Sequence, residues 1–248
     1  MQFGNMVDLC HELHTRTKVD HERSDKLINL KLLVVATDQA LWSKTIANFY
    51  FIFQALEEEL FRHKDHKHFW CLYIPELLRC KAFEEDLHYF FGDNWSSMVS
   101  PSPATKTFTQ HIHAVGRDNP ILLVAYCHSF YLALMAGGQI IKSMITKSLG
   151  LKNGLGTAAF QFRTKSASQL KKQLKDSING LGVDEEMKNK LIKEKILAYN
   201  MTNAIVKEIK LEPASFAGIV KFLFVFLIIP LVMAYIIYCQ YCVYFSRH

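Results

Sequence analysis

The chain has 248 residues, of which 50% are hydrophobic and 21% are charged, enough to bury one substantial core but not two full domains. Its net charge of +6 is spread along the chain rather than gathered into one basic block, which argues against nucleic acid as a partner. The cysteines lack the paired spacing of a metal site, and no apolar segment follows a basic N-terminus, so the expected compartment is reducing.

Residues 1–210 carry long helical patterns and no sustained strand-type alternation, which predicts a single all-α domain. The first predicted helix runs from about Val7 to Lys18, and one stripe of it carries Val7, Cys10, Leu13, His14 and Thr17. By residue type alone, a histidine on such a stripe is more often a core side chain than a metal ligand.

Two more helices are predicted in the next part of the chain. Aromatic and aliphatic residues predict one from about Ala40 to Lys64. The other begins at Pro75 and ends at Gly92, because proline suits a first helical turn and glycine suits a helix end. The histidines between these helices lie in the charged stretch RHKDHKH, which favours a solvated loop over a metal site.

A long apolar helix is predicted from Asn119 to Leu151, interrupted by the pair Gly137-Gly138. Glycine inside a helix costs about 1 kcal/mol, so the pair indicates a bend, a close helix crossing or a flat ligand near the backbone. After a turn at Gly154 to Gly156, the pattern predicts a basic helix, SQLKKQLKDSINGL, and a last helix that ends near Lys210.

The segment 222–246 is predicted to be a transmembrane anchor, joined to the domain by a linker at 211–221. Residues 222–239 are apolar throughout, and at about 1.5 Å per residue they reach roughly 27 Å, close to the thickness of a bilayer core. The alternative is a buried core helix. More lysines precede the span than basic residues follow it, which predicts a single-pass tail anchor with the large domain in the cytosol.

Several segments resemble the eukaryotic heme oxygenase family in their order and spacing, and together they span almost the whole soluble part. They are Asp8-Leu9, ELHT (12–15), ALEEEL (55–60), YIPEL (73–77), EDLHYFFGDNW (85–95) and LLVAYCHSFYLALMAGGQ (122–139). The resemblance implies a helical heme oxygenase-like domain. It also implies an enzyme that cleaves heme, its substrate and cofactor, to biliverdin, iron and carbon monoxide. The reaction uses O2 and electrons from an NADPH-dependent donor like cytochrome P450 reductase.

The resemblance implies an iron ligand and a kinked helix above the heme. A histidine at the place of His14 ligates the iron in the family, and Gly137-Gly138 matches the distal kink, whose close backbone restricts bound oxygen. Two positions depart from the family pattern. Leu134 stands where an aspartate orders proton-delivering waters, and Lys18 stands where an acidic partner of the ligand is common.

Four further residues are expected at the heme. Lys171 and Lys175, four residues apart on the basic helix, match positions that pair with heme propionates, although a solvated helix face is the usual role of such lysines. Tyr199 matches an aromatic wall position of the pocket. His128 replaces a tyrosine of the pattern and is a candidate for a proton path.

These departures leave three outcomes: a slow or less regioselective heme oxygenase, a heme protein with peroxidase-like reactivity, or a membrane-anchored protein that stores or senses heme. Ring cleavage is the expected activity because fold, ligand, kink and anchor are all kept. A cofactor-free helical scaffold is the alternative from another class. The expected location is the endoplasmic reticulum membrane, with the catalytic domain facing the cytosol.

Overall fold

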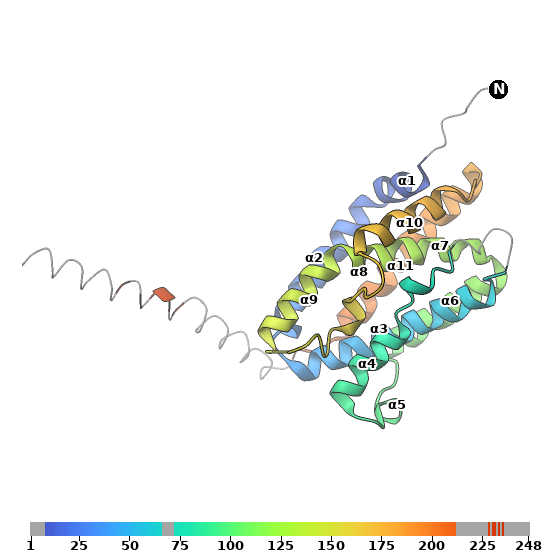
Figure 1. Cartoon of the computed structure of the whole chain (residues 1–248). Helices are drawn as coiled ribbons and strands as arrows, with labels where there is room; N and C mark the ends of the chain where they lie inside the picture. Colours follow the sequence, from blue (N-terminus) through green and yellow to red (C-terminus); the bar gives the residue numbers. More distant parts are fainter. Residues whose placement is uncertain are drawn as a thin grey trace, which may run out of the picture.

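The computed structural model describes residues 8–65 and 72–211, together with positions 228, 230, 231, 233 and 235. Within these residues the chain forms helices joined by turns, and no β-strand, so the predicted all-α fold is confirmed. Figure 1 shows one bundle in which α2 and α9 lie on one flank and α3, α4 and α6 on the other. Almost all of the predicted linker and anchor lies outside the described residues.

The α-helices are α1 (Leu9–Arg16), α2 (Lys18–Val35), α3 (Gln39–Arg62), α4 (Cys80–Phe91), α5 (Trp95–Met98), α6 (Pro103–Asp118), α7 (Leu123–Tyr126), α8 (Leu132–Met135), α9 (Gly137–Ser148), α10 (Ala167–Asn179) and α11 (Glu185–Glu208). The tighter 3-10 turns are η1 (Pro75–Leu77), η2 (Pro120–Leu122) and η4 (Ala158–Phe160), and η3 (Cys127–Tyr131) is a single π-helical turn. The sequence pattern predicts neither α2 nor α6.

The first predicted helix does not end the helical run at Lys18, because α2 begins there. The two helices meet at Thr17, whose hydroxyl donates to the carbonyl of Leu13 at 2.7 Å. A hydroxyl bonded back into the preceding turn bends a helix. The start of α2 is an almost unbroken polar run from Asp20 to Lys26, so hydrophobic periodicity gives no indication of it.

Helix α4 begins at Cys80 and not at Pro75, which opens the separate turn η1. The reason is the buried carboxylate of Glu57 on α3, which accepts hydrogen bonds from the N–H groups of Arg79 (2.5 Å) and Cys80 (3.1 Å). It therefore acts as a cap supplied by another helix. The predicted end of α4 at Gly92 is confirmed, with a φ of +76° that suits glycine.

The predicted apolar helix from Asn119 to Leu151 is interrupted as expected, and the bend of 47° falls at Ala136, just before Gly137. Within the described parts of the chain, no single helix is long and apolar enough to cross a membrane. The bent pair Pro120–Met135 and Gly137–Ser148 meets that test of length and composition together. Residues 123–127 of this pair are fully buried in the domain core.

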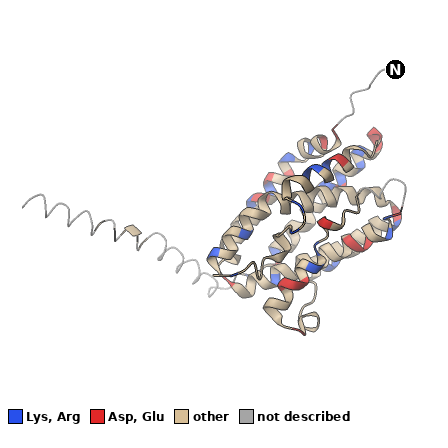
Figure 2. Ribbon diagram, in the orientation of Figure 1, with Lys and Arg blue, Asp and Glu red and all other residues tan. Residues whose placement is uncertain are grey.

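Basic and acidic residues are interspersed along the helices of the bundle (Figure 2). Helix α3 packs against α4 and α6, while α11 packs against α2 and α7. This arrangement leaves a space between α2, α3, α9 and α11, and the candidate site lies there.

Candidate functional site

A largely apolar cavity opens between α2, α3, α11 and the segment from η3 to α9. Its empty volume is about 1120 Å³, including the space at its mouth. The apolar side chains that line it are Ile28, Leu32, Val35, Trp42, Ile46, Phe49, Phe53, Phe83, Phe130, Ala133, Leu134, Ile141, Phe160, Val206 and Ile209. A concave apolar pocket with few polar groups is the usual form of a site for an organic ligand.

The imidazole that lines this cavity belongs to His21 on α2. Its Nδ1 lies 3.2 Å from Oδ2 of Asp25, one helical turn later. The ring packs edge-on against Tyr199, with ring centroids 5.5 Å apart. A carboxylate at one ring nitrogen orients an imidazole and leaves the other nitrogen free to bind a metal. His21 is thus built like a metal ligand with an acidic partner.

His14 does not lie where the sequence pattern predicts. It is exposed on α1 and does not line the cavity, whereas Cys10, Leu13 and Thr17 of the same predicted stripe are buried. The buried face of α1 turns toward α11, where Nζ of Lys195 donates to the carbonyl of Leu13 at 3.2 Å. The ring of His14 lies 6.3 Å from that of His21, so His14 lies at the edge of the cavity.

Sequence reasoning did not single out the His21–Asp25 pair, and it noted only that Lys18 stands where an acidic partner of the ligand is common in the family. The signal that would have found the pair is the spacing of four residues between a histidine and an aspartate, which places both on one helix face. The residues around them are polar, so hydrophobic periodicity does not predict a helix there and the spacing was not recognised.

Basic groups gather beyond the His21 end of the cavity, at the junction of α1, η3, α10 and α11. Lys195 is only 1% exposed, and burial lowers its pKa to about 8. Burial also lowers the pKa of His128 to about 3, and its Nδ1 has no hydrogen-bond partner. Partial burial and the Lys195 charge lower the pKa of His14. His128 is therefore neutral near pH 7, and of these three groups Lys195 is the one that carries positive charge toward an anionic substituent of a ligand.

Of the two expected lysines on α10, Lys175 belongs to this basic junction, and its carbonyl accepts a hydrogen bond from Sγ of Cys10 at 3.7 Å. Lys175 also acts electrostatically on His14 and His128. Lys171 is half-buried one turn earlier and does not line the cavity.

Tyr199 lines the cavity, and burial raises its pKa to about 12. Of the glycine pair, Gly138 lines the cavity and Gly137 is exposed outside it. A Cβ built on Gly138 would lie 3.1 Å from Cδ1 of Phe160 and 3.2 Å from the carbonyl of Ala133. A close packing contact with the Phe160 ring and the Ala133 carbonyl therefore favours glycine at this position.

Leu134 also lines the cavity and is 8% exposed. It lies on α8, directly before the bend at Ala136. The wall that α8 and α9 present to the cavity is therefore apolar at this point.

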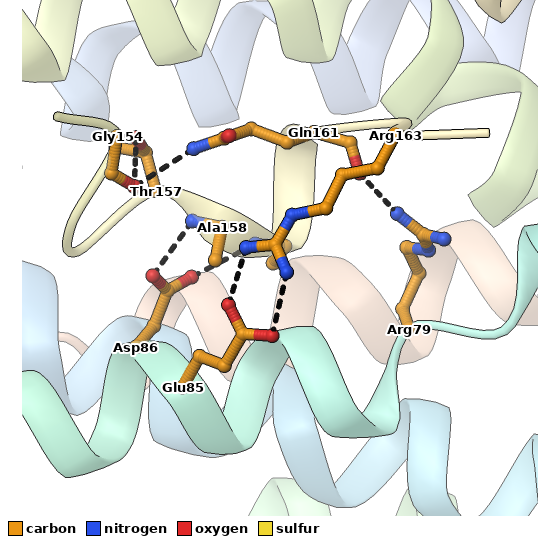
Figure 3. A network of polar contacts seen from close by, with 9 residues as sticks. Arg79, Glu85, Asp86, Gly154, Thr157, Ala158, Gln161 and Arg163 are labelled. Carbon is orange, nitrogen blue, oxygen red and sulfur yellow. Dashed lines mark hydrogen bonds and ion pairs between the residues drawn. The ribbon is translucent and has the colours of Figure 1, made fainter. Parts of the chain in front are cut away.

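Phe160, which lines the cavity, belongs to the turn Gly154–Gln161. A buried carboxylate on α4 holds this turn by hydrogen bonds. Asp86 is 0% exposed and accepts hydrogen bonds from the N–H groups of Ala158 (2.7 Å) and Ala159 (2.9 Å) (Figure 3). Burial raises the pKa of this carboxyl to about 7. The ring of Phe160 stacks on Trp42 with centroids 5.9 Å apart.

Two arginines complete this network on either side of the turn (Figure 3). Arg79 donates from Nη1 to the carbonyl of Gln161 at 2.6 Å, and Arg163 forms a bidentate ion pair with Glu85. The side-chain amide of Gln161 closes the turn by donating to the carbonyl of Gly154 at 2.8 Å. The turn is therefore held rigidly against the bundle.

Comparisons with known proteins agree on one family. The family model described as heme oxygenase matches residues 7–208. The heme oxygenase of Rhodella violacea is 30% identical over 88% of this chain and 94% of its own length.

Solved structures give the same result. Heme oxygenase-1 of Synechocystis, in complex with heme, aligns with a TM-score of 0.79 at 29% identity, over 88% of this chain and 98% of that chain. Heme oxygenase-2 of the same organism, in complex with heme and NO, aligns with a TM-score of 0.79 at 28% identity, over 86% and 88%. The relatives are cyanobacterial as well as algal and mammalian, so the match is broader than the eukaryotic group that the sequence resembles.

Proposed function

The chain belongs to the heme oxygenase family, and on this premise we propose that the cavity between α2 and α9 is where it binds heme and opens the ring to biliverdin, iron and carbon monoxide. The observation that carries this proposal is one imidazole, paired with a carboxylate, at the end of an apolar cavity that adjoins a basic junction. A flat apolar macrocycle with a central metal and carboxylate arms matches that combination.

We propose that His21, and not His14, is the iron ligand. His21 lines the cavity, and Asp25 would accept from its Nδ1–H and so leave Nε2 available to hold the iron. This assignment supplies the acidic partner that Lys18 could not provide to His14.

The heme carboxylates are proposed to lie at the basic junction. His14 and Lys175 belong to that junction, and Lys171 lies one turn earlier on α10. An anionic arm there would raise the pKa of His14 and would pair with at least one of these lysines. His14 thus becomes a carboxylate-binding residue in place of an iron ligand.

Leu134 is proposed to occupy the place of the family's distal aspartate. Its side chain lines the cavity and has no group that orders water, so this part of the wall of α8 and α9 would constrain bound oxygen by its shape. This apolar wall also supports one alternative, a protein that binds heme with impaired turnover.

Turnover of the full chain decides between the two functions. The chain in detergent is loaded with one equivalent of heme and supplied with O2, NADPH and a cytochrome P450 reductase. Loss of the Soret band with release of biliverdin and carbon monoxide is expected. A Soret band that survives many equivalents of electrons would show the alternative, heme binding without ring cleavage.

We further propose that electrons come from an NADPH-dependent reductase of that type and that the chain is anchored by residues 222–246 in the endoplasmic reticulum membrane with its domain in the cytosol. The support for the anchor is the apolar run of the sequence and the lysines before it. A membrane-bound reductase and an anchored oxygenase would then meet in the same plane.

A further inference from the structure

The kink between α8 and α9 leaves one backbone carbonyl without its normal helical partner. In a continuous α-helix the carbonyl of Leu134 accepts from the N–H of residue 138. Here it accepts from the side-chain Nε2 of Gln139 at 3.0 Å. The same Nε2 donates its other hydrogen to the carbonyl of Phe160 at 2.9 Å. One amide therefore joins the two sides of the kink to the turn Gly154–Gln161.

That turn is a firm support, because other helices hold it independently. Nε1 of Trp42 on α3 donates to the carbonyl of Gly156 at 3.0 Å, and Asp86 on α4 accepts from two of its N–H groups. The Phe160 ring meanwhile fills the space beside Gly138. Gln139 bonds both to α8 and to this turn, so it holds α8 and α9 in a set orientation relative to α3 and α4.

Both carbonyls that Gln139 holds belong to residues whose side chains line the cavity, Leu134 and Phe160. Leu134 has no polar group with which to direct bound oxygen, so the position of this wall would help to set which edge of a bound heme ring is accessible. Movement of the wall by a fraction of an ångström changes which edge is accessible.

We propose that Gln139 is a positioning residue that sets the kink of α8 and α9 over the heme and thereby the ring position at which heme is cleaved. The proposal rests on the proposed function. Leu134 is apolar and cannot direct the position of cleavage through a polar contact. In this proposal the side-chain amide of Gln139, which does not touch the reacting atoms, controls that position instead.

The test compares Gln139→Leu with the wild-type chain. The variant keeps the size of the side chain and loses both donors. In the heme-free protein, amide hydrogen exchange over residues 134–141 and 154–161 should accelerate about tenfold, as expected for the loss of one or two neutral hydrogen bonds. With ferric heme bound, the pH midpoint of the water-to-hydroxide transition should shift, and the ratio of biliverdin isomers should change, while heme affinity stays within about threefold.

Gln173→Leu is the matched control, since Gln173 is exposed on α10 and its amide oxygen accepts only an exposed Lys165 contact. It should leave exchange, midpoint and isomer ratio unchanged. If Gln139→Leu does not fold, Trp42→Phe loosens the same turn by removing the bond to Gly156 while keeping an aromatic ring against Phe160. It should move the same readouts in the same direction.

A folded Gln139→Leu chain with wild-type exchange would overturn the proposal. Faster exchange with an unchanged midpoint and isomer ratio would also overturn it, because Gln139 would then only support the fold. Failure of the wild-type chain to bind heme is a different result, which contradicts the proposed function, and the exchange comparison in the heme-free protein still tests the coupling through Gln139.

Discussion

At the scale of single residues, the two candidates for the iron ligand are His14 and His21, whose rings lie 6.3 Å apart. His21→Ala should weaken heme binding by about a hundredfold or more and abolish the spectrum of an imidazole-ligated heme, because it removes the side chain that lines the cavity beside Asp25. Absorption titration of the chain with heme measures both effects. Added imidazole should restore the spectrum.

His14→Ala is the matched control and should keep the imidazole-ligated spectrum, with at most about a tenfold weaker affinity from the loss of a carboxylate contact. The reverse pattern, in which His14→Ala loses the spectrum and His21→Ala keeps it, would restore His14 as the ligand.

A second prediction at this scale concerns the pH dependence that Asp86 gives to stability. Burial raises the pKa of this carboxyl from 3.8 to about 7, so the folded chain binds its proton more tightly than the unfolded chain does. The stabilisation that protonated Asp86 adds to the free energy of unfolding is therefore fully present below pH 3.8 and is lost as the pH rises to about 7.

Asp86→Asn removes this titration. The free energy of unfolding of the wild type minus that of the variant should thus fall by roughly 1 to 3 kcal/mol between pH 4 and pH 7. Urea unfolding at several pH values measures this difference. A difference that stays flat, or that rises with pH, would contradict the raised pKa.

At the scale of elements, the two glycines that open α9, Gly137 and Gly138, have different structural roles although they are adjacent in the sequence. Gly138→Ala places a methyl group 3.1 Å from the Phe160 ring and 3.2 Å from the Ala133 carbonyl, so one of them must shift. We expect a loss of about 1 to 2 kcal/mol in the free energy of unfolding and weaker heme binding, since both neighbours lie in the cavity wall.

Gly137→Ala is the control for this prediction, because a Cβ there meets nothing within 4 Å. Its free energy of unfolding should stay within about 0.5 kcal/mol of the wild type or rise slightly, as the unfolded chain loses freedom. Urea unfolding of both variants measures the contrast. Equal losses in the two variants would show that the bend, and not the Phe160 contact, requires glycine.

At the scale of the whole molecule, the described domain closes its own core, and its last helix ends at Glu208. A chain cut after residue 211 should therefore bind heme with unchanged affinity and fail to float with phospholipid vesicles, whereas the full chain floats. Sucrose-gradient flotation and heme titration of the two chains measure this. Flotation of the shortened chain to the same extent would place the membrane contact in the domain itself.

The sequence by itself determined the elements whose apolar pattern is strong. Helices α3 and α11, the interruption near Gly137 and the end of α4 at Gly92 all follow from local propensity and periodicity, since neighbouring residues suffice to produce them. The segments that resemble heme oxygenases likewise indicate the family without coordinates. The transmembrane anchor stays a prediction from length and hydropathy.

Only the tertiary structure shows which residues line the cavity. Periodicity places His14 on a face of α1, but the partner that this face meets depends on how α1 packs against α11. His21 and Asp25 lie in a polar run of α2, the helix that packs on α11. Asp86 and Gln139 bond to a turn some 20 to 70 residues away in the chain. Such contacts depend on how distant segments pack together, so they cannot be predicted from the neighbouring residues in the sequence.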